Sequence, residues 1–444
     1  MELTTSHLIQ LIIALFLGII LFATVNILPD RIIVSLLILI IPFQIIDSHY
    51  GSINMVFIYM AGIAFFLKKK LKFLPLKLPL FLLITAYFLS ITQVHRSTLF
   101  DHTIYLISIG SNFILFYIIY NFIRDAQNPR FVLDILVVLN VMFIFYCFFQ
   151  LLIGFERFTF LGIEEFSFIQ NRSDLRLGGP FRAVGITAEY LVIQIIILWY
   201  YILFTQNQKL KILYIITIAL NFAFLVATAN RGGFISLIIG IILFFYIFRK
   251  YIRFSGMLLA SILIPITFSI ISFLIITYTP YNLLYDRLFK TEFVGAIPDT
   301  RSYIWPTVWK EIEKKPILGH GPRFRLYNEE ERDIPGKKFI PYPHSLVLFI
   351  LYTIGVFGLL AYLVFGAALG LKMLQATHVH NSNTLLKEIP KLGILIFAIF
   401  LVDQLKVSFF RYLVSDFQHY IFMLFGMLVG FSDLLTSKNL IRQN

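Results

Sequence analysis

The chain has 444 residues, of which 59% are hydrophobic and 14% are charged, and its formal net charge is +13. Soluble domains carry about 25% charged residues, so this composition excludes an ordinary soluble domain, and the high apolar content excludes a disordered chain. The composition predicts an all-α fold, that of a polytopic integral membrane protein with mostly short connections.

Apolar runs bounded by charged or turn residues predict about 13 transmembrane helices, or about 12 if the first run does not span the membrane. These runs are 7–28, 32–47, 53–67, 78–93, 103–123, 131–153, 187–205, 212–230, 233–248, 254–278, 345–371, 392–410 and 418–435.

Basic residues predict the orientation, because short loops rich in Lys and Arg stay on the cytoplasmic side. Such loops lie at 68–72, 124–130, 209–211, 249–253 and 372–391, and two spans separate each from the next. Lys438 and Arg442 then place the C-terminus inside and, with 13 spans, the N-terminus outside. Since orientation and membrane lipids account for such charge, we expect no nucleic-acid partner.

The predicted organisation has five parts: N-terminal helices (1–153), a first outer loop (154–186), central helices (187–278), a large outer loop (279–343) and C-terminal helices (344–444). We expect the function on the outer loops, which a helical scaffold would hold in place. Within the large loop, Arg301–Lys315 has apolar residues at helical spacing and predicts an amphipathic helix. Gly319 and Gly321 follow it.

The segment from His344 to Leu360 combines a polar start with small residues further along. His344 and Ser345 stand at the outer end of a predicted span, and Gly355 and Gly358 return close to the same face of one continuous helix. Such a stripe is typical of a titratable group above a place where another helix approaches closely. The structural alternative is a helix-start histidine above an ordinary packing groove.

Three arginines are candidates for binding an anion. Arg231 lies at the outer boundary between two spans and precedes Gly232, Arg301 opens the amphipathic helix, and Arg182 precedes another span. Guanidinium groups match phosphate oxygens in a bidentate manner, and helix starts favour anions. The alternatives are an arginine that reaches the lipid headgroups, for Arg231, and solvated loop charges, for the other two.

Other polar residues give weaker signals. His378 and His380 have no cysteine or carboxylate nearby and predict a solvated loop, and His320 is a candidate second titrating group. Asp403, Gln404 and Lys406 interrupt a late span and predict an internal polar pair. No nucleotide-binding or zinc-hydrolase motif occurs, so we expect neither a metal nor a cofactor.

These elements together resemble the O-antigen ligase and Wzy-type polymerase superfamily of bacterial envelope glycosyltransferases. His344-Ser345, nine residues, then Gly355-x-x-Gly358 resembles its histidine–glycine signature. In the order of the family, the other matching elements are Arg182-x-x-Gly185, Asn230-Arg231-Gly232, Arg301-x-x-x-Trp305 and Pro316-x-x-Gly319-x-Gly321. Two departures are Asn230, where the family has serine, and Thr187-Ala188-Glu189, where many members have an Asn-Pro-Asn-like turn.

The resemblance implies a GT-C-like fold and an inverting, metal-independent transfer of a glycan from undecaprenyl diphosphate to a sugar hydroxyl. It implies a bacterial inner-membrane protein whose active site faces the periplasm. Arg231 and Arg301 would then bind the donor diphosphate, with Arg182 as a third contact. His344 would act as the general base on the acceptor hydroxyl or orient it.

The resemblance leaves the acceptor open. A ligase in lipopolysaccharide biosynthesis uses lipid A-core, whereas a polymerase uses a second lipid-linked glycan. One dominant outer loop directly before the histidine favours the ligase. A lipid-linked glycan transporter is the alternative from another class, but it would place charges deep within several spans, whereas the candidate charges here gather at one face.

Overall fold

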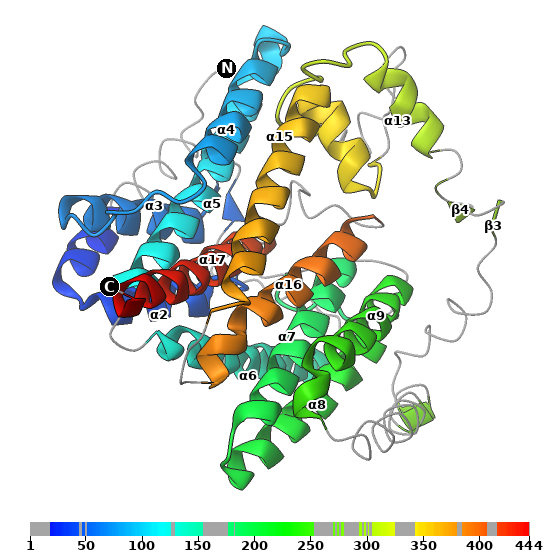
Figure 1. Ribbon diagram of the computed structural model, residues 1–444. Coiled ribbons are helices and arrows are strands. Elements are labelled where there is room, and N and C mark those ends of the chain that lie inside the picture. Colours follow the sequence, from blue (N-terminus) through cyan, green and yellow to red (C-terminus); the bar gives the residue numbers. More distant parts are fainter. Residues whose placement is uncertain are drawn as a thin grey trace.

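The protein is described by a computed structural model that covers residues 18–43, 47–48, 51–125, 129–153, 176–181, 183–252, 270, 273–274, 277–278, 293–294, 297–298, 301, 304–324, 342–379, 384–405 and 415–443. Figure 1 shows a bundle of helices in this part of the chain. The all-α prediction is confirmed, because the strands are two antiparallel pairs of two-residue segments: β1 (Asp47–Ser48) with β2 (Gly51–Ser52), and β3 (Phe293–Val294) with β4 (Ile297–Pro298).

An apolar helix at Gly18–Ile27 precedes the labelled helices. These are α2 (Asp30–Ile40), α3 (Ile53–Leu67), α4 (Lys77–Ile91), α5 (Leu99–Asp125), α6 (Arg130–Ile153), α7 (Val184–Phe204), α8 (Gln208–Ala227), α9 (Arg231–Phe248), α13 (Ile304–Ile312), α15 (Leu346–Ala376), α16 (Thr384–Gln404) and α17 (Ser415–Gln443). Within the described residues, seven helices are long and apolar enough to cross a membrane. The chain is therefore a polytopic membrane protein, in which helices satisfy the backbone hydrogen bonds that lipid cannot.

The two ends of the bundle differ in their charges. Basic residues at or near helix ends pair with carboxylates: Lys68 and Lys70 with Asp30, Lys250 and Lys391 with Glu388, and Arg124 and Lys372 with Asp433. We call this the basic end. It gathers side chains from four of the loops that the sequence assigns to one side of the membrane.

The other end holds the start of α5 and the start of α9. Lys315 Nζ, just after α13, donates to the carbonyl oxygen of Gln93 at 2.8 Å, and Arg323 pairs with Asp101 in the first turn of α5 at 3.3 Å. Figure 1 shows α13 beside the bend in α15. This end, which we call the loop end, therefore carries the amphipathic helix predicted from Arg301–Lys315, and Ile304, Val308 and Ile312 of that helix are buried.

The helix that follows His344 is not continuous, so the prediction of one uninterrupted span over 345–371 was wrong. Gly355 has φ +70° and ψ −170°, which no helix accommodates, and it divides α15 into two segments. Figure 1 shows the first segment at a sharp angle to the second. Leu346 and Ile350 consequently line the same apolar groove as Tyr362 and Leu363, so the bend folds the start of α15 back along its own later turns.

The bend is stabilised by backbone hydrogen bonds to the turn after α13. The amide groups of His320 and Gly321 donate to the carbonyl oxygens of Tyr352 and Thr353 at 2.8 and 3.0 Å, and that of Val356 donates to Pro316 at 2.8 Å. Bonds within α15 are lost at the bend, and these replace them, as a buried backbone requires. A loop, not another helix, is thus what approaches the glycines.

Close backbone contact explains two glycines of the sequence pattern. Gly319 has φ +70°, and a Cβ on it would overlap the backbone of Thr353. A Cβ on Gly355 would overlap the backbone of Ile317 in the same way. Only glycine permits both the positive φ and the close approach of the two backbones. We call this contact, in which Gly319 packs on Thr353 and Gly355 packs on Ile317, the joint.

We predict that Gly319→Ala destabilises the protein by about 3 kcal/mol or more, because the added methyl group meets rigid backbone at a positive φ. Gly366→Ala in α15 is the matched control, since its Cβ would lie 3.4 Å from Phe397 in ordinary contact. Thermal unfolding in detergent should show a lower Tm for the first variant and an unchanged or higher Tm for the second. An unchanged Tm for Gly319→Ala would contradict the claim that the backbone contact at Gly319 requires glycine.

Candidate functional site

The turn between α8 and α9 sets the position of Arg231. Ala229 has a positive φ of 47°, which makes the turn tight, and Asn230 Oδ1 accepts from the amide of Gly233 at 3.3 Å as the N-cap of α9. Asparagine therefore performs the capping that serine also performs well. Arg231 is consequently the first residue of an 18-residue helix, whose start carries partial positive charge.

The guanidinium group of Arg176 forms hydrogen bonds with the backbone of this turn. Its Nε donates to the carbonyl oxygen of Thr228 at 2.9 Å and its Nη2 to that of Ala229 at 3.3 Å. These carbonyl groups end α8 and lack partners within the helix. No local sequence pattern reveals this role of Arg176, because its partners lie about 50 residues away in the chain.

Arg301 lies close enough to Arg231 for their charges to interact. The pKa of the Arg301 guanidinium is lowered from its ordinary value, first because the side chain is partly buried and second because Arg231 repels its charge. The two arginines are 70 positions apart in the sequence, so the fold brings like charges together. Such an arrangement is typical of a place that receives an anion.

Trp305 connects this arginine pair to the histidine. Its indole Nε1 donates to the carbonyl oxygen of Pro343 at 2.9 Å. Pro343 is the residue before His344, and Trp305 lies four positions after Arg301. His344 is half-buried, has a positive φ of 49°, and contacts Tyr342 edge to face at a ring distance of 5.0 Å. A left-handed backbone is uncommon for a residue other than glycine and is found at functional sites.

A buried polar layer lies beside the start of α9. Gln404 Nε2 donates to the carboxylate of Glu189 at 3.3 Å, and Ser236 Oγ donates to Asp403 at 3.2 Å. The bonds join α16 to α7 and α9. Asp403 and Gln404 therefore have polar partners inside the bundle, and the partners described here lie on other helices. Lys406 lies outside the described residues.

Glu189 received no site role in the sequence, although it is a carboxylate inside a predicted span. The sequence contained a signal, since an ionisable residue within a membrane span is energetically costly and often marks a functional site. Gly233 packs directly on Ala188, so Glu189 is held next to the first turn of α9. A search for lone carboxylates in apolar runs would have found it.

His320 belongs to the joint between the loop and α15. Its ring stacks on Tyr352 at 4.7 Å, and Nε2 lies 2.8 Å from the carbonyl oxygen of Glu311, so Nε2 carries the proton and donates. Burial lowers the pKa of this histidine, and the hydrogen bond to Glu311 offsets part of that effect. His320 therefore acts as a neutral structural group.

Of the four site residues predicted from the sequence, the structure thus brings Arg231 and Arg301 together, and the hydrogen bond of Trp305 connects the segment after Arg301 to the residue before His344. Arg182 lies outside the described residues, as does His380. Gly232 is the second residue of α9, Gly319 and Gly355 form the joint, and Gly358 makes room for the side chain of Ile354 across the bend. Gly321 packs on Val94 and His102. Within the described part of the chain, no group of three metal-ligating side chains occurs.

This architecture defines a class of protein: a polytopic helical membrane protein with arginines and a histidine gathered by a loop at one end of the bundle. Comparison with protein families matches residues 216–363 to Wzy_C, described as O-antigen ligase. Residues 216–363 of this membrane protein therefore contain a Wzy_C domain, as the sequence pattern indicated. No curated protein shows a significant match.

The matched region covers about one third of the chain and holds most of the site. It begins within α8 and ends within α15, so it includes Arg231, Arg301, His344 and the glycine joint, while Arg182 and Glu189 precede it. A Wzy_C domain is typical of proteins that transfer lipid-linked glycans, of the O-antigen ligase or polymerase type.

We predict that the stability of the joint depends on pH through His320. The lowered pKa means that the folded protein binds the proton less well than the unfolded chain, so stability is complete above the ordinary value of 6.5 and falls as the pH drops through the lowered pKa. In His320→Gln, Tm at pH 8 should be lower than in the original protein but should fall less toward pH 5. Parallel Tm curves from pH 8 to pH 5 would contradict this role.

Proposed function

We propose that the protein transfers a glycan from undecaprenyl diphosphate to a sugar hydroxyl, at the periplasmic face of the bacterial inner membrane. The observation that carries the proposal is the approach of Arg301 to Arg231, with Trp305 connecting the segment after Arg301 to the residue before His344. The match to Wzy_C supports the reaction class, and the orientation rests on the basic residues at the opposite end of the bundle.

The arginine pair suits the leaving group. When the bond between the sugar carbon and the diphosphate oxygen breaks, negative charge grows on the diphosphate and must be stabilised. Two partly buried guanidinium groups, together with the start of α9, supply positive charge without a metal. We infer that Arg231 and Arg301 bind the donor diphosphate, that Gly232 lets backbone N–H groups approach it, and that Arg182 adds a third contact.

His344 suits the acceptor side. The acceptor oxygen attacks the sugar carbon while its proton passes to the imidazole, and attack opposite to the leaving diphosphate inverts the configuration. An imidazole titrates near neutral pH, which fits a general base. The carbonyl group of Pro343 is bound by Trp305, so the helix that carries Arg301 also positions the backbone next to the proposed base.

We further propose that the acceptor is lipid A-core, which makes the protein an O-antigen ligase of lipopolysaccharide biosynthesis. The support is the single dominant outer loop, 279–343, directly before His344. A Wzy-type polymerase would use the same donor site and a lipid-linked glycan acceptor, so the acceptor alone separates the two.

We predict that Arg231→Ala and Arg301→Ala each lower kcat/KM by about 100-fold or more, the usual loss when one group that stabilises transition-state charge is removed. The matched control is Arg249→Ala, at the opposite end of α9, where the arginine lies over the ring of Tyr246. The measurement is glycan transfer by purified protein from an undecaprenyl diphosphate donor. Full activity of both site variants, with normal membrane insertion, would exclude the diphosphate role.

We predict that the purified protein forms a new glycosidic bond with lipid A-core and that His344→Asn lowers this rate by about 100-fold to 10,000-fold. Asparagine tolerates a positive φ, so the variant should keep the fold. The product is detected by mass spectrometry with either acceptor. Transfer to a lipid-linked glycan alone would identify a polymerase, and no bond with either acceptor would favour a transporter. Full activity of His344→Asn would exclude His344 as the general base.

A further inference from the structure

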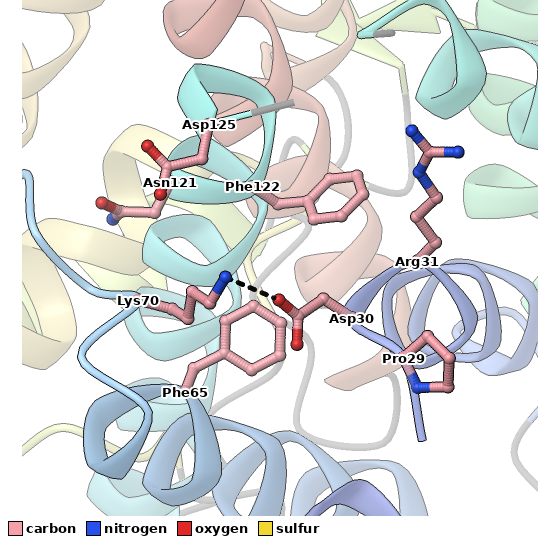
Figure 2. Close-up of a pocket in the computed structure, with 8 residues that line it drawn as sticks. All are labelled: Pro29, Asp30, Arg31, Phe65, Lys70, Asn121, Phe122 and Asp125. Atoms are coloured by element: carbon pink, nitrogen blue, oxygen red, sulfur yellow. Dashed lines mark ion pairs between the residues drawn. The ribbon is translucent and has the colours of Figure 1, made fainter. Parts of the chain in front are cut away.

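We propose that a cavity at the basic end binds the phosphoethanolamine headgroup of a membrane phospholipid. The cavity measures about 390 Å³, which is within the size range of small-molecule sites. Its lining residues are Pro29, Asp30, Arg31, Phe65, Lys70, Asn121, Phe122 and Asp125, and Figure 2 shows them around the cavity. Neither Arg231 nor His344 takes part in it.

The cavity lies where a lipid headgroup would lie. Asp30 and Arg31 open α2, Lys70 follows the end of α3, and Asp125 ends α5, which has 27 residues and so is about 40 Å long. The start of α5 is at the loop end, so the cavity is a membrane thickness away from the proposed glycan site. This depth is that of the polar headgroups on the other leaflet.

The charges of the cavity fit a headgroup that carries both signs. Lys70 lies 3.3 Å from Asp30, and Asp125 lies 3.4 Å from Lys72. The remaining basic lining residue is Arg31, and among the described residues no carboxylate lies within ion-pair distance of its exposed side chain. Figure 2 shows this side chain extending away from Asp30. A phosphate on Arg31 would supply an anion for this guanidinium group.

The acidic residues favour an ammonium group with N–H donors. The pair between Asp125 and Lys72 is a partly exposed one, with 34% and 57% of the side chains accessible, and such pairs contribute little. A primary ammonium group can therefore replace Lys72 on Asp125 and donate hydrogen bonds, which the methylated nitrogen of phosphocholine cannot. A headgroup with negative charge alone would instead meet both carboxylates.

The surroundings favour a lipid over a free phosphate. Ile32 and Leu36 follow Arg31 on α2 with exposed apolar side chains, and Phe66 and Leu67 lie exposed at the end of α3. These four residues flank the cavity and offer an apolar surface to acyl chains, as basic pockets between transmembrane helices do for bound lipids. A free phosphate would gain nothing from them.

The experiment is native mass spectrometry of the full-length protein in detergent with short-chain phospholipids that differ only in the headgroup. We expect phosphoethanolamine lipid to be retained about tenfold better than phosphocholine or phosphoglycerol lipid. Arg31→Gln should lower the retention of both phosphoethanolamine and phosphocholine lipids about tenfold, because it removes the contact with the phosphate group. Asp125→Asn should abolish only the preference for phosphoethanolamine. Arg249→Gln, an exposed arginine at the same end but outside the cavity, should change nothing.

Equal retention of phosphoethanolamine and phosphocholine lipids by the original protein would overturn the proposal, and so would stronger retention of phosphoglycerol lipid. Displacement of the lipid by inorganic phosphate would show a site for a free anion instead. Unchanged retention by Arg31→Gln would place the lipid elsewhere. The assay measures lipid binding and no glycan transfer, so its outcome is independent of the proposed function.

Discussion

The docking of one stretch of backbone on another at Gly355 determines how the rest of the loop end is arranged. A helix that loses its bonds within a membrane must find replacements, and here the turn after α13 supplies them. Because the turn is fixed to α15, α13 is fixed as well, and with it Trp305 and Arg301. The bend also folds the start of α15, which follows His344, back toward α16. Two glycine motifs that are separate in the sequence are therefore the two halves of one joint.

The joint has an electrostatic consequence. It holds Arg301 near Arg231, although burial and like charge both oppose that placement. A conformation of this kind is stable only because the packing around it determines it, and the apolar side of α13, with Val308 fully buried, supplies part of that packing. Repulsion between the guanidinium groups decreases when an anion lies between them. A site arranged in this way needs little rearrangement to receive an anion, which agrees with the diphosphate-binding role that we propose.

Much of this arrangement was predictable from the sequence, and the parts that were not share one cause. Apolar runs gave the helices, and the order of motifs gave Arg231, Arg301 and His344, because both are local patterns. The break at Gly355 was not predictable from periodicity, since a glycine inside an apolar run is compatible with a helix. The partners of Arg176 and the role of Glu189 depend on contacts between distant segments, which a local pattern does not contain. Arg182 lies outside the described residues, so its role remains a prediction.

Helix α5 connects the two functional regions that we propose. Its first turn receives the loop, through the ion pair of Asp101 with Arg323 and the hydrogen bond from the amide of Arg323 to His102 Nδ1 at 3.1 Å. Its last turns supply Phe122 and Asp125 to the cavity at the basic end. Along its length it packs closely on α17, where a Cβ on Gly426 would lie 2.6 Å from the carbonyl oxygen of Phe116. In our proposal, this close packing lets α5 link the lipid-binding cavity at the basic end to the loop and its arginines at the loop end.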